Sequence, residues 1–149
     1  MADILRHKGS GSSGGNAVAT VSPSATLEAA TRLLGERRIG ALVVSEDGVS
    51  VAGILSERDV VAHLAAVGRV GLDSTVATVM TREVRTCEPS ESLEQLMKTM
   101  TDGRFRHVPV VVDGRLTGIV SIGDLVARRL DQLETESARL HDYIQTGRG

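Results

Sequence analysis

The stretch TVSPSATLE at residues 20–28 returns as TCEPSESLE at residues 86–94, an offset of 66 positions. A second match, GILSERD at 53–59 with GIVSIGD at 118–124, follows at an offset of 65. Between residues 20 and 48, nine of 29 positions are identical in the two copies. The chain therefore contains two copies of one unit of about 45 residues, the signature of an internal structural repeat.

Each copy has the pattern of a strand, a helix, two strands and a second helix. Apolar side chains recur at helical spacing after Thr26 and Ser92, whose hydroxyl groups suit an N-cap. Branched apolar runs predict strands, and the Asp-Gly pairs between them are hairpin signals. Ser56 and Ser121 are expected to begin the second helices. The expected strands are 18–21, 41–44 and 51–55 in the first copy, and a strand around Cys87, 108–112 and 116–120 in the second.

These elements predict an α+β fold. One copy is too small to bury both faces of its strands, so we expect the two copies to stack face to face as one pseudo-twofold globule with a closed core. From Leu125 onward the sequence predicts one long helix. Its residues Leu130, Leu133, Ser137, Leu140 and Ile144 are alternately three and four positions apart, as in the a and d positions of a coiled coil. The predicted segments are an N-terminal segment with a flexible Gly/Ser loop (1–17), repeat 1 (18–66), a linker (67–79), repeat 2 (80–130) and a C-terminal helical extension (131–149).

Composition argues against several functions. The chain of 149 residues carries 17 Lys and Arg against 19 Asp and Glu, so it has no bulk positive charge to hold nucleic acid or an acidic membrane. Phe105 and Tyr143 are its only aromatic residues, too few to stack successive bases. A single cysteine, Cys87, leaves no disulfide framework or multi-cysteine zinc site. No stretch approaches the roughly 20 apolar residues of a membrane span, and the N-terminus lacks a signal-peptide core, so we expect a cytoplasmic protein.

Several motifs resemble those of a known family. RHVPV at 106–110, the two GI-x-S-x-x-D segments at 53–59 and 118–124, and VMT at 79–81 are similar to motifs of paired CBS (cystathionine-β-synthase) domains. The resemblance covers residues 18–130 and is to the free-standing pair called a Bateman module. It implies a regulatory sensor that binds an adenosine nucleotide in clefts between the repeats, with AMP, ADP, ATP or NAD as the ligand and with no obligatory cofactor.

The Ser-x-x-Asp motif of each copy allows two roles. At a helix N-terminus the acid lies one turn beyond the serine, where an ionised Asp59 or Asp124 can accept hydrogen bonds from both ribose hydroxyls. Unpaired N–H groups at the same helix end suit a phosphate. The same residue pair also forms a simple helix cap, and without the repeat context the cap is the favoured role. Both roles are compatible, because the carboxylate can exchange its backbone bond for a ligand.

Charge placement predicts two unequal clefts. Arg106 and His107 stand where members of the resembled family contact phosphate, whereas the equivalent residues of repeat 1 are Gly40 and Ala41. The stronger cleft is expected to use Ser121, Asp124, Arg106 and His107, with Gly40 and Ala41 from the other copy. The weaker cleft is expected to use Ser56, Asp59 and Arg58. The base would lie among apolar side chains whose alternative role is core packing: Val18, Ala41, Leu42, Val84, Val108 and Pro109.

Three functions are compatible with these patterns. The first is a non-catalytic sensor, read by an effector protein that the sequence does not identify. The second is an enzyme, which we do not expect because no spacing ties Cys87, His63 and His107 into a catalytic or metal-binding set. The third is a ligand-independent homodimerisation scaffold, in which the C-terminal helix makes the contact. A homodimer is expected for the sensor as well as for the scaffold.

Overall fold

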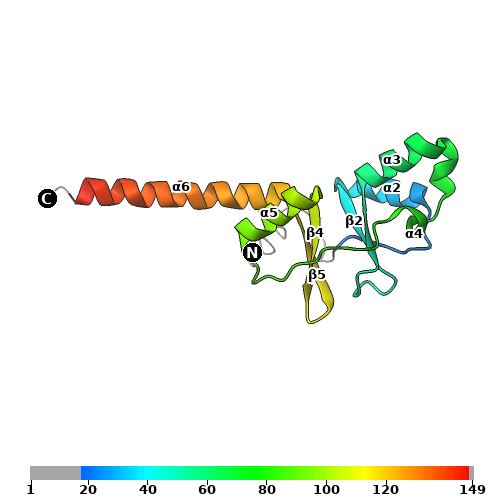
Figure 1. The fold of residues 1–149 in the computed structure, drawn as a ribbon, viewed down its shortest axis with the longest axis horizontal. Coiled ribbons are helices and arrows are strands. Elements are labelled where there is room, and N and C mark those ends of the chain that lie inside the picture. The colour runs from blue at the N-terminus through cyan, green and yellow to red at the C-terminus, as the bar shows by residue number, and fades with distance from the viewer. Residues whose placement is uncertain (1–17, 148–149) are drawn as a thin grey trace.

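The computed structural model describes residues 18–147, so the Gly/Ser loop predicted within 1–17 lies outside the described residues. Figure 1 shows the strands of both repeats in the middle of the molecule, helices α2 and α3 at one side, α5 at the other, and α6 running away from both. The predicted α+β fold of two repeats with a long C-terminal helix is confirmed. The elements are β1 (Thr20–Val21), α2 (Leu27–Arg37), β2 (Ala41–Val44), β3 (Gly53–Ser56), α3 (Glu57–Val67), the 3₁₀ helix η1 (Arg69–Asp73), α4 (Val76–Val79), α5 (Leu93–Gly103), β4 (His107–Val112), β5 (Arg115–Ser121) and α6 (Ile122–Thr146).

Repeat 1 forms a three-stranded sheet in the order β1-β2-β3, with β1 parallel and β3 antiparallel to β2. Helix α2 begins after the predicted N-cap Thr26, whose hydroxyl accepts a hydrogen bond from the N–H of Ala29 at 3.2 Å. The helix ends at Arg38, which adopts the left-handed conformation with φ 53° and turns the chain into β2. Strand β2 has the predicted bounds, while β1 is two residues shorter than predicted.

Repeat 2 forms a two-stranded antiparallel sheet of β4 and β5. The prediction of a strand around Cys87 is wrong, because Cys87 makes only an isolated parallel bridge to Val110. In repeat 1 the N–H of Val43 donates to the carbonyl of Ala19 at 3.3 Å and so extends the pairing. The equivalent residue of repeat 2 is Pro109, which has no N–H to donate, and the ladder therefore stops at the bridge.

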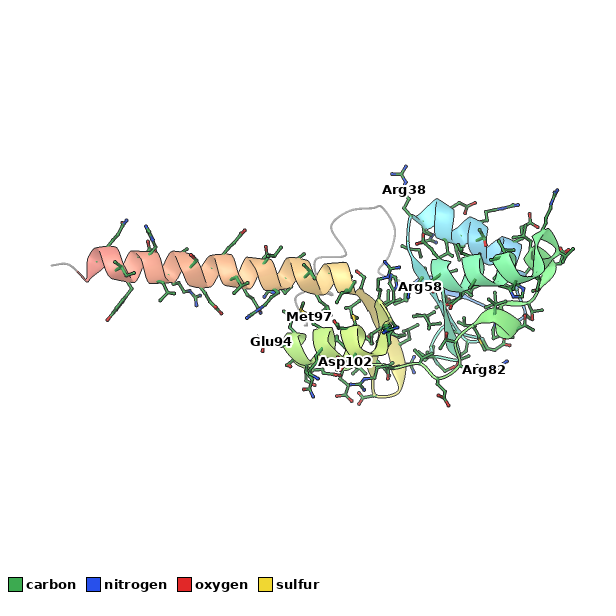
Figure 2. All side chains as sticks on the ribbon, turned by 45° about the horizontal axis from the view of Figure 1, so that its top comes forward. Arg38, Arg58, Arg82, Glu94, Met97 and Asp102 are labelled. Atoms are coloured by element: carbon green, nitrogen blue, oxygen red, sulfur yellow. The ribbon has the colours of Figure 1, made fainter. Side chains whose placement is uncertain are left out.

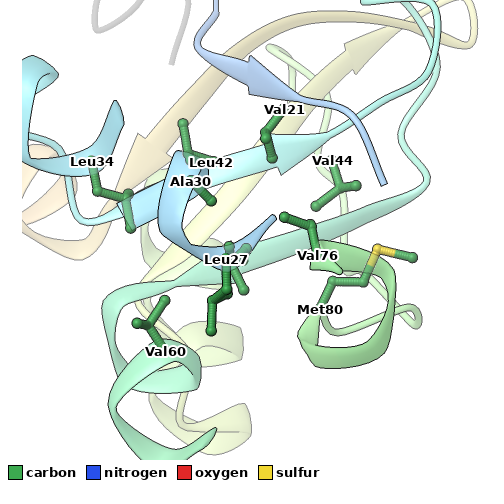
Figure 3. Packing of buried hydrophobic residues seen from close by; sticks show 10 residues of the cluster. Val21, Leu27, Ala30, Leu34, Leu42, Val44, Val60, Val76 and Met80 are labelled. Carbon is green, nitrogen blue, oxygen red and sulfur yellow. The ribbon is translucent and has the colours of Figure 1, made fainter. Parts of the chain in front are cut away.

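The buried apolar side chains fall into two clusters, one in each repeat, where the sequence had predicted a single closed core. Figure 3 shows the repeat 1 cluster, in which helices α2, α3 and α4 cover one face of the sheet. Strand β2 is buried along its whole length, so its opposite face, carrying Ala41 and Val43, is covered as well. The repeat 2 cluster consists of Cys87, Leu96, Met100, Val108, Val110, Val120 and Leu125. Each repeat thus has its own core on the helix side of its sheet.

The predicted linker, 67–79, is packed against repeat 1. Its helix α4 contributes Val76, which is fully buried in the repeat 1 cluster. Backbone hydrogen bonds hold it in place, from the N–H of Leu27 to the carbonyl of Ser74 at 2.8 Å and from the N–H of Val76 to the carbonyl of Ala25 at 2.8 Å. The chain therefore leaves repeat 1 at a fixed point and direction.

Within residues 18–147, no helix combines the length and the apolar character that crossing a bilayer requires.

Candidate binding cleft

A cleft of about 680 Å³ is lined by residues of both repeats. Its walls come from the end of β3 and the start of α3 in repeat 1, and from the start of β4 and the end of β5 in repeat 2. Figure 2 shows Arg58 at the end of α3 nearest to repeat 2. The lining residues are Gly40, Ile54, Ser56, Glu57, Arg58, Asp59, Thr81, Glu83, Val84, Arg85, Gly103, Arg104, Phe105, Arg106, His107, Ser121 and Ile122.

The two sides of the cleft repeat the same backbone arrangement. The N–H of Glu57, the first residue of α3, donates to the carbonyl of Gly40 at 3.0 Å. The N–H of Ile122, the first residue of α6, donates to the carbonyl of Arg106 at 2.9 Å. Gly40 and Arg106 are equivalent in the repeat alignment, and so are Glu57 and Ile122. Each second helix is thus fixed to the start of its neighbouring strand in the same way.

Both Ser-x-x-Asp motifs form capping boxes at the helix ends beside the cleft. The N–H of Ser56 donates to Oδ2 of Asp59 at 2.8 Å, and the N–H of Ser121 donates to Oδ2 of Asp124 at the same distance. The hydroxyl of Ser56 also donates to Oδ2 of Asp59 at 2.8 Å. The cap role weighed from the sequence is therefore present in both repeats.

These caps change the expected phosphate site. The first N–H of each helix donates to the carbonyl of the residue just before a strand, Gly40 or Arg106. The third N–H donates to a serine hydroxyl, from Asp59 at 3.4 Å and from Asp124 at 3.2 Å. Among the described residues this leaves the N–H groups of Arg58 and Gly123 as the remaining donors at the two helix ends. The helix ends consequently offer a phosphate fewer donors than predicted, and arginine side chains are the larger source of positive charge.

His107 of repeat 2 packs over Gly40 of repeat 1. A Cβ atom added at Gly40 would lie 3.1 Å from Cε1 and 3.2 Å from Nε2 of His107. Such distances are tighter than ordinary side-chain contacts, so the absence of a side chain at Gly40 makes room for the imidazole. This contact joins residues that the sequence predicted to serve one cleft from opposite copies.

Seven of the ten predicted site residues line this cleft. The sequence had assigned them to two separate clefts, and the structure brings residues of both together in one. The seven are Gly40, Ser56, Arg58, Asp59, Arg106, His107 and Ser121. Three others do not line it. Ala41 is buried in β2, and Val18 and Asp124 are half-buried outside the lining.

The lining also contains residues that the sequence reasoning missed, mainly in the segment 81–85, of which only Val84 had been predicted, as part of the slot for the base. The N–H of Ile54 donates to the carbonyl of Thr81 at 3.0 Å, and the N–H of Thr81 donates back at 2.9 Å. This bridge carries Glu83 and Arg85 past the edge of β3 into the cleft. The VMT motif at 79–81 marked the start of repeat 2, but nothing in it indicated pairing back onto repeat 1. With these residues the lining holds four arginines and His107 against the three carboxylates Glu57, Asp59 and Glu83.

Cys87 lies in a different place and has the properties of a structural residue. It is buried in the repeat 2 core, as predicted. Burial, with a smaller contribution from the carboxylate of Glu91, raises the pKa of the Cys87 thiol to about 11. The thiol therefore stays protonated at neutral pH, which does not favour nucleophilic chemistry. Among residues 18–147 no cluster of His, Cys, Asp and Glu could hold a metal ion.

The profile of the CBS domain family matches residues 16–66 and 76–131, which are the two repeats of this chain. The chain belongs to the CBS-domain family. The CBS domain-containing protein CBSX3, mitochondrial, of Arabidopsis thaliana is 34% identical over 99% of this chain and 72% of its own length. The CBS domain-containing protein YhcV of Bacillus subtilis is 38% identical over 81% of this chain and 83% of its own length.

Solved structures agree with the sequence relatives. The CBS-domain containing protein ATU1752 from Agrobacterium tumefaciens has a TM-score of 0.77 and 42% identity, over 85% of this chain and 96% of that one. The CBS domain pair of protein MJ0100, solved in complex with 5′-methylthioadenosine and S-adenosyl-L-methionine, has a TM-score of 0.68 and 25% identity, over 77% of this chain and 89% of that one.

Proposed function

We propose that this CBS pair is a non-catalytic regulatory module that binds an adenosine nucleotide in the cleft between its repeats. The observation that carries the proposal is the lining of that cleft. It combines residues of both Ser-x-x-Asp motifs with four arginines and a histidine, in a volume of about 680 Å³ that suits a ligand of this size. The MJ0100 pair, solved in complex with two adenosine compounds, supports the ligand class.

The ribose would bind at a capping carboxylate. Oδ2 of Asp59 already accepts two hydrogen bonds from Ser56, and no described residue bonds to Oδ1. A carboxylate can accept about four hydrogen bonds, so Asp59 has the capacity to take a ribose hydroxyl while the cap stays intact. Asp124 would serve the second repeat in the same way after turning from its cap.

Phosphate would be held by the cations that repeat 2 contributes. Arg106 and His107 are side chains that repeat 1 replaces with Gly40 and Ala41, so the positive charge of the cleft is unequal between its two halves. The half containing Arg106, His107 and Ser121 is proposed to bind the nucleotide more tightly, and the half containing Ser56, Arg58 and Asp59 less tightly. AMP, ADP, ATP and NAD are the candidate ligands.

The chain offers a matched pair of variants for the test. Arg104 lines the cleft, whereas its counterpart Arg38 does not, and both are exposed C-cap residues in the left-handed conformation, with φ 55° and 53°. Figure 2 shows Arg38 at the C-terminal end of α2, with its side chain pointing away from the molecule. Calorimetric titration with AMP, ADP, ATP and NAD should show binding that Arg104→Gln and Arg106→Gln weaken and Arg38→Gln leaves unchanged. An equal effect of Arg38→Gln and Arg106→Gln, or no binding of any of the four compounds, would refute the proposal.

A ligand-independent homodimerisation scaffold is the second candidate, and the exposed apolar face of α6 favours it. A thermal-shift series separates the two functions, because a ligand that binds only the native state raises the melting temperature with its concentration. The scaffold requires a melting temperature that depends on protein concentration and not on nucleotide. The cytoplasmic location and the effector protein stay predictions, and the Arabidopsis relative is named as mitochondrial.

A further inference from the structure

The distal half of α6 leaves the rest of the molecule. Its first turns pack on α5, where Leu125 is buried and Arg129 forms an ion pair with Glu94 at 3.2 Å. From residue 133 to residue 147 every position is exposed. Figure 1 shows this part of the helix extending alone, away from both repeats. Residues 132–149 also lie beyond the segment that matches the CBS domain family.

Such a helix needs a partner to bury its apolar side chains. Leu130 is 55% exposed, Leu140 63% and Ile144 62%, all on a helix that depends on tertiary packing for most of its stability. The helix has no proline, and after Gly123 it has no glycine before residue 147. Because it is continuous and points outward, it cannot fold back to cover these side chains with its own repeats.

The exposed side chains follow a heptad pattern. Val126, Leu133 and Leu140 occupy d positions, and Leu130, Ser137 and Ile144 occupy a positions, so that five of six successive layers are apolar. At about 1.5 Å per residue the stripe is roughly 27 Å long. Six layers are a short coiled coil, which is enough when the paired helices are each anchored in a folded domain. The stripe thus has the geometry of a helix-pairing surface.

The charges on α6 indicate which kind of partner binds the apolar stripe and whether two paired helices run parallel or antiparallel. Helix α6 carries three arginines against five carboxylates, a net charge of −2, which opposes binding to an anionic lipid surface. In a parallel pair the g and e positions place Arg129, which also pairs with Glu94 of its own chain, beside Glu134 of the second copy. They place Glu136 beside His141 of the second copy. In the antiparallel arrangement that keeps all six layers, Glu134 would face Glu134 and Glu136 would face Glu136. The pattern is self-complementary only in the parallel direction.

We propose that the α6 stripe of one chain pairs with the same stripe of a second chain as a parallel, in-register two-stranded coiled coil. The pairing brings the two CBS pairs to the same end of the coil, with Ser137 of each chain meeting at a polar layer. This inference does not depend on nucleotide binding, because it uses none of the residues that line the cleft.

The first test measures the dimer by sedimentation equilibrium of the full chain over the micromolar range. A double variant, Leu133→Asp with Leu140→Asp, should raise the dissociation constant by about two orders of magnitude or more, because it places charges in two apolar layers of each helix. The control is Ala138→Asp, which adds a single carboxylate to the outer face of the same exposed helix. Circular dichroism and the melting transition of the repeats confirm that each variant is folded. An unchanged dissociation constant in the double variant, or a monomeric parent chain, would overturn the proposal.

The second test reads the direction of pairing. In a Cys87→Val background, Ser137→Cys should form an interchain disulfide under mild oxidation, because in-register a positions lie side by side across a parallel pair. An antiparallel pair would put residue 137 opposite residue 133, and the same variant would then fail to cross-link. Ala138→Cys, on the outer face, is the control for random collision. Cross-linking of Ser137→Cys at the rate of Ala138→Cys would contradict the parallel arrangement.

Discussion

The two repeats keep one backbone pattern and differ in how much sheet they build. At the position where repeat 1 has Val43, whose N–H donates to Ala19 at 3.3 Å, repeat 2 has Pro109, which has no N–H. One substitution therefore reduces a parallel strand to the single bridge at Cys87, while the neighbouring hairpin and helices are retained. The comparison teaches that the helices and the central hairpin define the unit, and that the first strand is an addition to it.

The repeats also differ in a complementary way at the cleft. Repeat 2 places the large side chains of Arg106 and His107 there, and repeat 1 has Gly40 and Ala41 at the equivalent positions. The imidazole of His107 occupies the space that a side chain at Gly40 would take. Loss of symmetry thus lets two similar halves fit together, and it concentrates positive charge on one half of the cleft.

Exchanging a core residue between the repeats should have the largest effect. Leu96 in repeat 2 and its counterpart Ala30 in repeat 1 are both fully buried. Leu96→Ala leaves a cavity that repeat 1 does not have, so the free energy of unfolding should fall by about 2–5 kcal/mol. Urea denaturation measures this, with Val61→Ala as the control at a side chain that is 67% exposed. A loss no greater than that of Val61→Ala would contradict the separate repeat 2 core.

The contact between Gly40 and His107 should give the next effect. Gly40→Ala places a methyl group 3.1 Å from the imidazole and should cost about 1–3 kcal/mol of stability through overpacking. His107→Ala in the same chain should recover that loss. Gly35→Ala is the control, since nothing lies within 4 Å of an added Cβ in that part of α2. The repeats are not in contact as described if Gly40→Ala and Gly35→Ala have the same effect.

The two capping boxes should have equal and moderate effects. Ser56→Ala and Ser121→Ala each remove a hydroxyl that caps a helix, so each should lower the free energy of unfolding by about 1 kcal/mol. Chemical denaturation with Ser24→Ala, an exposed serine before α2, provides the baseline. If only one of the two variants lowers the free energy of unfolding, the two helix ends are not equivalent.

Much of this architecture could be predicted, because it depends on local patterns. Local signals predict two features: the bounds of β2 and the helix N-caps Thr26, Ser56, Ser92 and Ser121. These signals are hydroxyl groups, the spacing of hydrophobic residues and turn residues, all within a few positions of each other. Pairing between distant segments could not be predicted. The bridge from Ile54 to Thr81 joins residues 27 positions apart and has no sequence signature, so the contribution of Glu83 and Arg85 to the cleft was missed. The division into two cores was missed for the same reason, since periodicity identifies a buried face without identifying what covers it.

The difference between Cys87 of repeat 2 and Val21 of repeat 1 should also affect how the free energy of unfolding depends on alkaline pH. Cys87 has a pKa raised to about 11 by burial, whereas an unfolded cysteine titrates near 8.5. The native state therefore keeps a proton that the unfolded state loses, and the stability that this adds is present below about pH 8.5 and is lost as the pH rises toward 11. Cys87→Val, which copies Val21 of repeat 1, should remove that part of the slope between pH 8.5 and 10.5 in urea denaturation. An identical slope in parent and variant would count against a buried thiol.

The smallest expected effect is at the two hairpin turns. Oδ1 of Asp47 accepts hydrogen bonds from the N–H groups of Val49 and Ser50, both at 2.8 Å, and these hold the pKa of the Asp47 carboxyl well below its usual range. Its stabilisation is therefore present above about pH 4 and is lost as the pH falls through the lower native value. Asp47→Asn should flatten the acid limb of the stability curve. Asp113→Asn, at the equivalent turn, is the control for the loss of one carboxylate, and a larger change in the acid limb for Asp113→Asn than for Asp47→Asn would contradict the account.

A crystal structure of the chain with AMP tests the central claim most directly. The account predicts electron density for the nucleotide between the repeats, with its ribose on the carboxylate of Asp59 or Asp124 and its phosphate on Arg106 and His107. It would be contradicted by a cleft filled by the protein's own side chains, with neither aspartate bonded to a nucleotide at saturating AMP.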